Sequence, residues 1–237
     1  MNTPSPELHL DRSSAIPGTW ALIAGLAAAH VASAAVLVGS GRVGWPGALV
    51  LARSVRMRVT VGGQYRPLVD DGQLWRLMRS VLLHADLAHL LVNLVALWVL
   101  GRILEPWVGP VRLWCWFLLA GLGGSVASHL VGLLQSDGAS GGAFGLFAAA
   151  VVLAWRARAS LPDEDRPVLL RALPGLLVLN LAVGLALPVI DGIAHVGGLL
   201  VGVALAFAVR SPRPGRTWLA LEGAVAAVLV IWACWPR

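Results

Sequence analysis

The sequence predicts an all-α protein that crosses a membrane seven times. Of its 237 residues, 58% are hydrophobic and 13% are charged, and the mean hydropathy is +0.79. A water-soluble domain cannot cover its surface with so few polar residues. The apolar residues form seven runs, each close to the roughly 20 residues that a helix needs to span a bilayer. These runs cover about residues 20–39, 86–104, 112–134, 140–156, 168–187, 192–209 and 217–235.

The first run follows a short N-terminal segment, residues 1–19, and could be confused with a cleaved signal peptide. Ala-Ser-Ala at 32–34 resembles a cleavage site, but the apolar run continues beyond it. The preceding segment also carries acidic as well as basic residues, which is not typical of a signal peptide. We therefore expect an uncleaved first span.

The distribution of arginine predicts the orientation of the spans, because all 18 basic residues are Arg. With a cytoplasmic N-terminus, the loops after the second, fourth and sixth runs are cytoplasmic and contain nine Arg, whereas the short loops 135–139 and 188–191 contain none. This asymmetry fits the positive-inside rule. The long first loop, about residues 40–85, disagrees because it would face outward with seven Arg, but long loops translocate with less regard to charge.

The first loop itself is predicted to be structured and partly interfacial. Trp45, Tyr65 and Trp75 alternate there with Arg and Gly residues, as in an amphipathic segment lying on a membrane surface. The positive charges lie in short loops and not in a continuous stripe, so we expect the lipid bilayer and not nucleic acid as the environment. Cys115 and Cys234 lie inside apolar runs and match no metal-ligand spacing, so we expect inert thiols, no metal and no cofactor.

Five strongly polar residues lie in or at the ends of the apolar runs. They are His84, His89, Asn93, Ser140 and His195. Such groups are costly at membrane depth, so each needs a partner or a function. Hydrogen bonds between helices explain any one of them alone. Together they supply a nucleophile, a base and two hydrogen-bond donors near the outer face, which favours a catalytic site.

Small residues follow two of these side chains at four-residue spacing. Ser140 opens its run and His195 lies one turn into another, and the small residues are Gly141 and Gly145 in the first, Ala194, Gly198 and Gly202 in the second. Such faces let two helix backbones approach closely. We therefore expect the packing of these two helices to bring the hydroxyl and the imidazole together.

The chemistry of this set predicts an activated serine. An adjacent imidazole can take the proton of Ser140 and later return it to a leaving amine, which makes His195 the base. His89, Asn93 and the backbone N–H of Ser140 are candidate donors to an oxyanion, and a helix N-terminus adds positive charge there. Asp137 and Asp191 are interpreted as caps of the helices that follow them, so we expect a Ser-His dyad without a third, acidic member.

Four stretches of the sequence resemble the rhomboid family of intramembrane serine proteases, in order and in spacing. They are LWRLMRSVLLHADLAHLLVN at 74–93, LGRILEPWVG at 100–109, GASGGAFG at 138–145 and AHVGGLLVG at 194–202. The resemblance implies a six-helix core over residues 20–209, with 217–235 as an additional C-terminal transmembrane helix. It also implies the active site, with Ser140 as nucleophile, His195 as base, His89 and Asn93 in the oxyanion hole, and His84, Gly138 and Phe144 in support.

The resemblance includes one departure and several structural residues. Phe144 stands where the family commonly has a tyrosine that stacks on the catalytic histidine, so the ring is kept and the hydroxyl is lost. Trp75 and Arg76 match a Trp-Arg pair in the first loop of the family, and Glu105 matches an acidic residue with a structural role.

The resemblance implies transmembrane proteins as substrates, cut in or next to a transmembrane segment near the outer face. A substrate helix must unwind locally before one of its peptide bonds can be attacked. We expect the substrate to enter laterally past the fifth run, where Pro174, Gly175 and Gly184 make the helix easier to deform. We expect a multi-pass protein of a cell membrane, of the bacterial inner-membrane type, because the compact chain shows no transit peptide. No feature predicts an oligomeric state.

Two alternative functions fit parts of the pattern. A catalytically inactive rhomboid-like protein would bind membrane clients, but the presence of both Ser140 and His195 favours the enzyme. A small transporter would show an inverted repeat and a polar cluster at the midplane, whereas this sequence shows no repeat and a cluster near one face.

Overall fold

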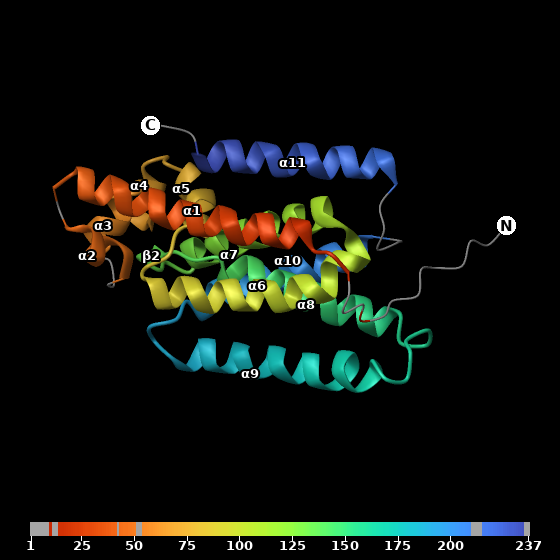
Figure 1. Ribbon diagram of the computed structural model, residues 1–237. Coiled ribbons are helices and arrows are strands. Elements are labelled where there is room, and N and C mark those ends of the chain that lie inside the picture. The colour runs from red at the N-terminus through yellow and green to blue at the C-terminus, as the bar shows by residue number, and fades with distance from the viewer. Residues whose placement is uncertain (1–9, 11–13, 42, 51–53, 210–214, 235–237) are drawn as a thin grey trace.

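In the described part of the chain, seven long helices form the body of the protein (Figure 1). The structure is a computed structural model that describes residues 10, 14–41, 43–50, 54–209 and 215–234. The long helices are α1 (Pro17–Gly39), α6 (Leu87–Val108), α7 (Pro110–Leu130), α8 (Ser140–Arg156), α9 (Leu173–Ala186), α10 (Gly192–Ala208) and α11 (Arg216–Cys234).

The helix lengths and composition agree with the predicted fold class, an all-α polytopic membrane protein. Within the described residues, five helical segments are long and apolar enough to cross a membrane: α1, α6, α7, α11 and the segment Val168–Ala186, in which a short π-helix, η2 (Val168–Ala172), leads into α9. Helices α8 and α10 are also apolar but have only 17 residues each. Most of the predicted N-terminal segment 1–19 and the end of the predicted last span lie outside the described residues.

One predicted boundary is wrong, at the end of the third run. We expected this span to reach residue 134, but α7 ends at Leu130. Gly132 has a φ of 88°, a left-handed conformation that glycine adopts without strain and that ends a helix. The next residues turn into the short strand β2 (Gln135–Ser136).

The first loop is built from short elements gathered at the left-hand end of the bundle in Figure 1. These are α2 (Trp45–Val50), α3 (Val55–Thr60), β1 (Gln64–Tyr65), α4 (Arg66–Asp70), α5 (Trp75–Arg79) and the 3₁₀ turn η1 (Ser80–Leu82). Strand β1 pairs with β2 in an antiparallel ladder, with Gln64 opposite Ser136. The first loop is therefore attached to the segment that precedes Ser140, while its position at a membrane interface stays a prediction.

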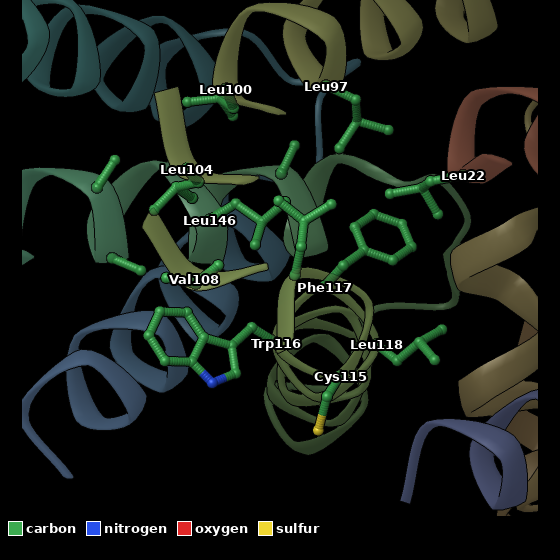
Figure 2. Close-up of a cluster of buried hydrophobic side chains, with 14 of the residues drawn as sticks. Leu22, Leu97, Leu100, Leu104, Val108, Cys115, Trp116, Phe117, Leu118 and Leu146 are labelled. Carbon is green, nitrogen blue, oxygen red and sulfur yellow. The ribbon is translucent and has the colours of Figure 1, made fainter. Parts of the chain in front are cut away.

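The core lies where α6, α7 and α8 meet. Figure 2 shows leucines of α6, Phe117 and Trp116 of α7, and Leu146 of α8 converging in one buried cluster. Helices α8 and α10 pack still more closely, because a Cβ atom on Gly198 would collide with the carbonyl oxygen of Gly141, and one on Gly202 with that of Gly145. The close approach predicted from the small-residue spacing is confirmed.

Helices α9 and α11 lie on opposite sides of the bundle (Figure 1). Helix α9 buries only Leu173, Leu177 and Gly184, and side chains such as Val178 are exposed, as expected for a surface that faces lipid. Helix α11 packs against α7 and α5. The carboxylate of Glu222 on α11 accepts a hydrogen bond of 2.7 Å from Arg112 on α7, so a partly buried ion pair joins the last helix to the core.

Glu105 has the structural role that the family resemblance implies. Its Oε1 accepts from the backbone N–H of Gly18 at 2.8 Å, and its Oε2 accepts from the N–H of Thr19 at 2.7 Å and from its hydroxyl at 2.6 Å. The first N–H groups of a helix have no partner within the helix. Glu105 on α6 therefore caps α1 from a distant part of the chain.

Candidate active site

Ser140 is the first residue of α8 and is half-buried. The two residues before it are held by the first loop and its continuation: the N–H of Gly138 donates to the carbonyl of Ser80 at 3.0 Å, and the N–H of Ala139 donates to Nε2 of His84 at 3.4 Å. The N–H groups at the start of α8 lack partners within the helix and carry partial positive charge. An anion forming next to the Ser140 hydroxyl would be stabilised there.

His89 and Gly138 lie beside this hydroxyl. Gly138 has a φ of 142°, and a Cβ atom at this position would lie 2.8 Å from Cε1 and 2.9 Å from Nε2 of His89. The same point lies 3.8 Å from Oγ of Ser140. A side chain at position 138 would therefore collide with the imidazole of His89, and glycine leaves room for that ring. The buried ring of His84 packs edge-on against His89, with ring centroids 5.2 Å apart.

His195 lies in the first turn of α10 and is 6% exposed. The ring of Phe144 stacks on its imidazole with 4.1 Å between centroids and 14° between planes. Phe144 is four residues after Ser140, one turn along the same face of α8. At the edge of the imidazole, a Cβ atom on Gly184 of α9 would lie 2.6 Å from Nδ1. Contacts with α8 and α9 therefore set the orientation of the His195 ring.

Ser140 and His195 lie on closely packed helices but are not joined by a hydrogen bond within the described chain. In the same part of the chain, Nδ1 of His195 is buried without a hydrogen-bond partner. Catalytic hydrogen bonds are often long before substrate binds, so the two residues remain candidates.

Asp191 caps α10, as predicted. Its Oδ1 accepts from the N–H of Ala194 at 2.9 Å, and its Oδ2 accepts from the hydroxyl of Ser128 at 2.5 Å. Both carboxylate oxygens are thus engaged away from the imidazole, which supports a dyad.

The predicted cap by Asp137 is wrong. Among the described residues no side chain caps α8, whose N-cap residue is Ala139. The Asp137 carboxylate instead accepts from the backbone N–H of Gln64 at 3.0 Å and pairs with Arg58 at 3.5 Å. The spacing of Asp137 and Ser140 suits a cap, but the first loop covers this segment and offers the carboxylate other donors.

Asn93 lies one turn after His89 on α6 and is 4% exposed. Its Nδ2 donates to the backbone carbonyl of His89 at 3.0 Å, so the structure does not bring it to Ser140 by a hydrogen bond. An amide nitrogen carries two hydrogens, and this hydrogen bond uses one of them. In the described chain no group of three or more His, Cys, Asp or Glu residues could hold a metal ion, and both cysteines are free thiols.

Sequence reasoning overlooked Ser80 and Ser128 and did not connect Gly184 to the site. Ser128 is a polar residue in an apolar run, a signal that was present in the sequence. Ser80 acts through its backbone carbonyl, which no side-chain pattern reveals. Gly184 was expected to soften α9, and nothing in the local sequence indicates that it faces His195.

The fold and the site define a polytopic helical membrane protein with a serine and a histidine on two tightly packed helices. Residues 71–212 match the Rhomboid domain family. This match covers more than half of the chain, and the chain belongs to the rhomboid family.

The similar proteins include one that is named a protease and one that is named inactive. Rhomboid protease GluP of Bacillus subtilis is 33% identical over 171 residues, which is 70% of this chain and 32% of that protein. RHOMBOID-like protein 5 of Arabidopsis thaliana is 36% identical over 165 residues, 67% of this chain and 52% of that protein. Inactive rhomboid protein 2 of Homo sapiens is 37% identical over 143 residues, 60% of this chain and 16% of that protein. The matched part thus spans about half of these relatives or less.

Proposed function

We propose that the chain is an intramembrane serine endopeptidase that hydrolyses peptide bonds in or next to transmembrane segments of other membrane proteins. Ser140 is the nucleophile and His195 the base. The observation that carries the proposal is the stack of Phe144 on His195, because it joins the helix that Ser140 opens to the ring of the base. Membership of a family that includes named proteases agrees with it.

The reaction follows from the contacts of the imidazole. Gly184 packs against the Nδ1 edge of His195, so Nε2 is the nitrogen that takes the proton of Ser140 as Oγ attacks the scissile carbonyl carbon. The same proton passes to the leaving amine as the peptide bond breaks, and an acyl-enzyme remains. His195 then takes a proton from water, whose oxygen attacks the ester and releases the second product with Ser140 restored.

The negative charge on the substrate oxygen needs donors in the transition state. We assign the backbone N–H of Ser140, the imidazole of His89 and the second amide hydrogen of Asn93 to this oxyanion hole. The positive end of α8 supports them. His84 and Gly138 support the site through the contacts described above, His84 as acceptor from Ala139 and Gly138 by making room for His89.

The proposed architecture is a six-helix core over residues 20–209 with 217–235 as an additional C-terminal helix. The N-terminus faces the cytoplasm of a bacterial cell, and the site opens toward the outer face of the inner membrane. A substrate segment reaches the site laterally, past helix α9. This helix buries few of its side chains in the bundle. The substrates are transmembrane proteins, and the proposal includes no cofactor.

The test is labelling of the purified, detergent-solubilised protein by a fluorescent fluorophosphonate. Wild-type protein should be labelled, and Ser140→Ala and His195→Ala should fall to background while remaining folded. Ser33→Ala is the matched control, because Ser33 is a helical serine whose hydroxyl bonds to the carbonyl of Ala29. Full labelling of Ser140→Ala would refute the assignment of the nucleophile. Folded wild-type protein that neither labels nor cleaves a membrane-protein reporter would favour the inactive, client-binding alternative.

A further inference from the structure

Asp137 is a buried acid three residues before Ser140, and the dyad does not use it. Its side chain is 0% exposed, whereas that of its partner Arg58 is 24% exposed. Burying a carboxylate is unfavourable unless charged or hydrogen-bonding partners compensate for the lost water. The charged carboxylate is therefore stable in this position only while its protein partners stay in contact with it.

The partners of Asp137 belong to the first loop. The N–H of Gln64 donates to Oδ1 at 3.0 Å and Nη1 of Arg58 lies 3.5 Å from Oδ2. A Cβ atom on Gly63 would lie 2.6 Å from Oδ1, so a glycine is needed for this close approach. Next to these contacts, the N–H of Arg66 donates to the carbonyl of Leu134 at 2.9 Å. Side-chain and ladder contacts thus bind residues 58–66 to residues 134–137.

Arg76 stabilises the first-loop side of this junction, residues 58–66. Its Nη1 donates to the carbonyls of Val59 and Gly63, both at 3.0 Å. Burial lowers the pKa of the Arg76 guanidinium, the charge of Arg79 lowers it further, and the Asp137 carboxylate acts in the opposite direction. The negative charge of Asp137 therefore favours the charged form of Arg76, whose hydrogen bonds hold the first loop in place.

The junction continues directly into the site. After Asp137, the N–H of Gly138 bonds to Ser80 and that of Ala139 bonds to His84. Ser140 follows and begins α8. Only two residues separate the carboxylate from the serine, so a shift of Asp137 moves the Ser140 hydroxyl and the N–H groups beside it.

We propose that Asp137 is a positioning residue that clamps the segment 137–140 to the first loop and so holds the Ser140 hydroxyl and backbone N–H in their reactive arrangement. Its catalytic consequence rests on the proposed peptidase function. Asp137 acts through the backbone and does not touch the reacting atoms. The sequence motif Asp-x-x-Ser alone predicts a helix cap, so the clamp is a property of the tertiary structure.

The experiment compares Asp137→Ala, Asp137→Asn and Arg58→Gln with the matched control Asp70→Asn. Asp70 pairs with Arg66 in the same loop at 3.6 Å and with His129 of α7 at 3.3 Å, but its side chain is 54% exposed, and exposed pairs contribute little. The first measurement is the rate constant for labelling of Ser140 by the fluorophosphonate, with kcat and KM for a membrane-protein reporter. The second is hydrogen–deuterium exchange of the Gly138 and Ala139 amides.

Asp137→Ala should slow labelling and lower kcat by about 10-fold to 100-fold, because a displacement of about 1 Å suffices for such losses. KM should stay near the wild-type value, and the Gly138 amide should exchange faster. Asp137→Asn should lose less, since an amide oxygen still accepts from Gln64, and Arg58→Gln should resemble it. Asp70→Asn should match wild type.

Wild-type labelling rates in both Asp137 variants would overturn the proposal. If Asp137→Ala fails to fold, Asp137→Asn and Arg58→Gln decide it, with the folded fraction measured for each. If wild-type protein and Asp70→Asn are both unlabelled, the proposed peptidase function fails instead. The amide exchange then decides the clamp by itself, and unchanged exchange in the Asp137 variants would refute it.

Discussion

The imidazole of His195 lies flat on the phenyl ring of Phe144, with 4.1 Å between the ring centroids. This stack joins two helices that also touch through the backbones of Gly141 and Gly198. In the described chain, Nδ1 of His195 has no hydrogen-bond partner. Packing, and not a carboxylate, therefore orients the proposed base.

The stack predicts that the ring of Phe144 matters more than its volume. Phe144→Leu keeps a large apolar side chain but removes the flat surface, so we expect fluorophosphonate labelling of Ser140 to fall about 10-fold as the imidazole loses its fixed orientation. Phe144→Tyr keeps the ring and should retain activity. Phe147→Leu is the control, since Phe147 is a neighbouring half-buried phenylalanine of α8. Equal labelling of both leucine variants would show that the stack has no role in orientation.

The contact between Gly184 of α9 and His195 predicts that a larger side chain at position 184 disturbs the proposed base. In Gly184→Ala the new methyl group would lie 2.6 Å from Nδ1 and 3.1 Å from Cε1 of His195, so the ring must move, and we expect kcat to fall about 10-fold or more. Gly175→Ala is the matched control, because nothing lies within 4 Å of a Cβ atom there. The measurement is cleavage of a membrane-protein reporter, with KM determined separately. A wild-type kcat for Gly184→Ala would contradict this prediction, because it would show that α9 moves aside without displacing His195.

Gly198 predicts a loss of stability in the contact between α8 and α10. A methyl group there would collide with the backbone of Gly141, and overpacking of this kind costs about 1–3 kcal/mol. The check is the unfolding midpoint of Gly198→Ala in detergent. Gly39→Ala, at the C-terminal end of α1 where nothing lies within 4 Å of a Cβ atom, should change the free energy of unfolding by less than about 0.5 kcal/mol. Equal midpoints for the two variants would contradict the close packing.

Glu105 predicts a change in stability without a change in chemistry. Glu105→Gln replaces one acceptor oxygen by a donor, so donors of Gly18 or Thr19 lose their bonds to it, at a cost of about 1–3 kcal/mol. Glu105 lies 16 residues after His89 on α6, about 24 Å along the helix. The folded fraction should therefore label at the wild-type rate. Glu164→Gln, which changes an exposed acid, should leave the unfolding midpoint unaltered.

Several features could be predicted because their cause is local. The close packing of α8 and α10 could be predicted from the four-residue spacing of Gly141, Gly145, Gly198 and Gly202. The cap by Asp191 could be predicted from its position directly before α10. The same local argument failed for Asp137, whose partner Gln64 lies 73 residues earlier in the chain. It failed also at the end of α7, because the apolar residues Leu133 and Leu134 lie beyond the end of the helix and lead into the short strand β2.

The sequence by itself determined the class of fold and the identity of the candidate site residues. Apolar runs about as long as a bilayer is thick must form helices, because backbone groups find no partners in lipid, and a lone serine and histidine in such runs require a reason. Only the tertiary structure decided what touches them. Phe144 and Gly184 around His195, and Asp137 against the first loop, depend on how distant segments pack, and a linear pattern does not specify contacts between segments so far apart in the chain.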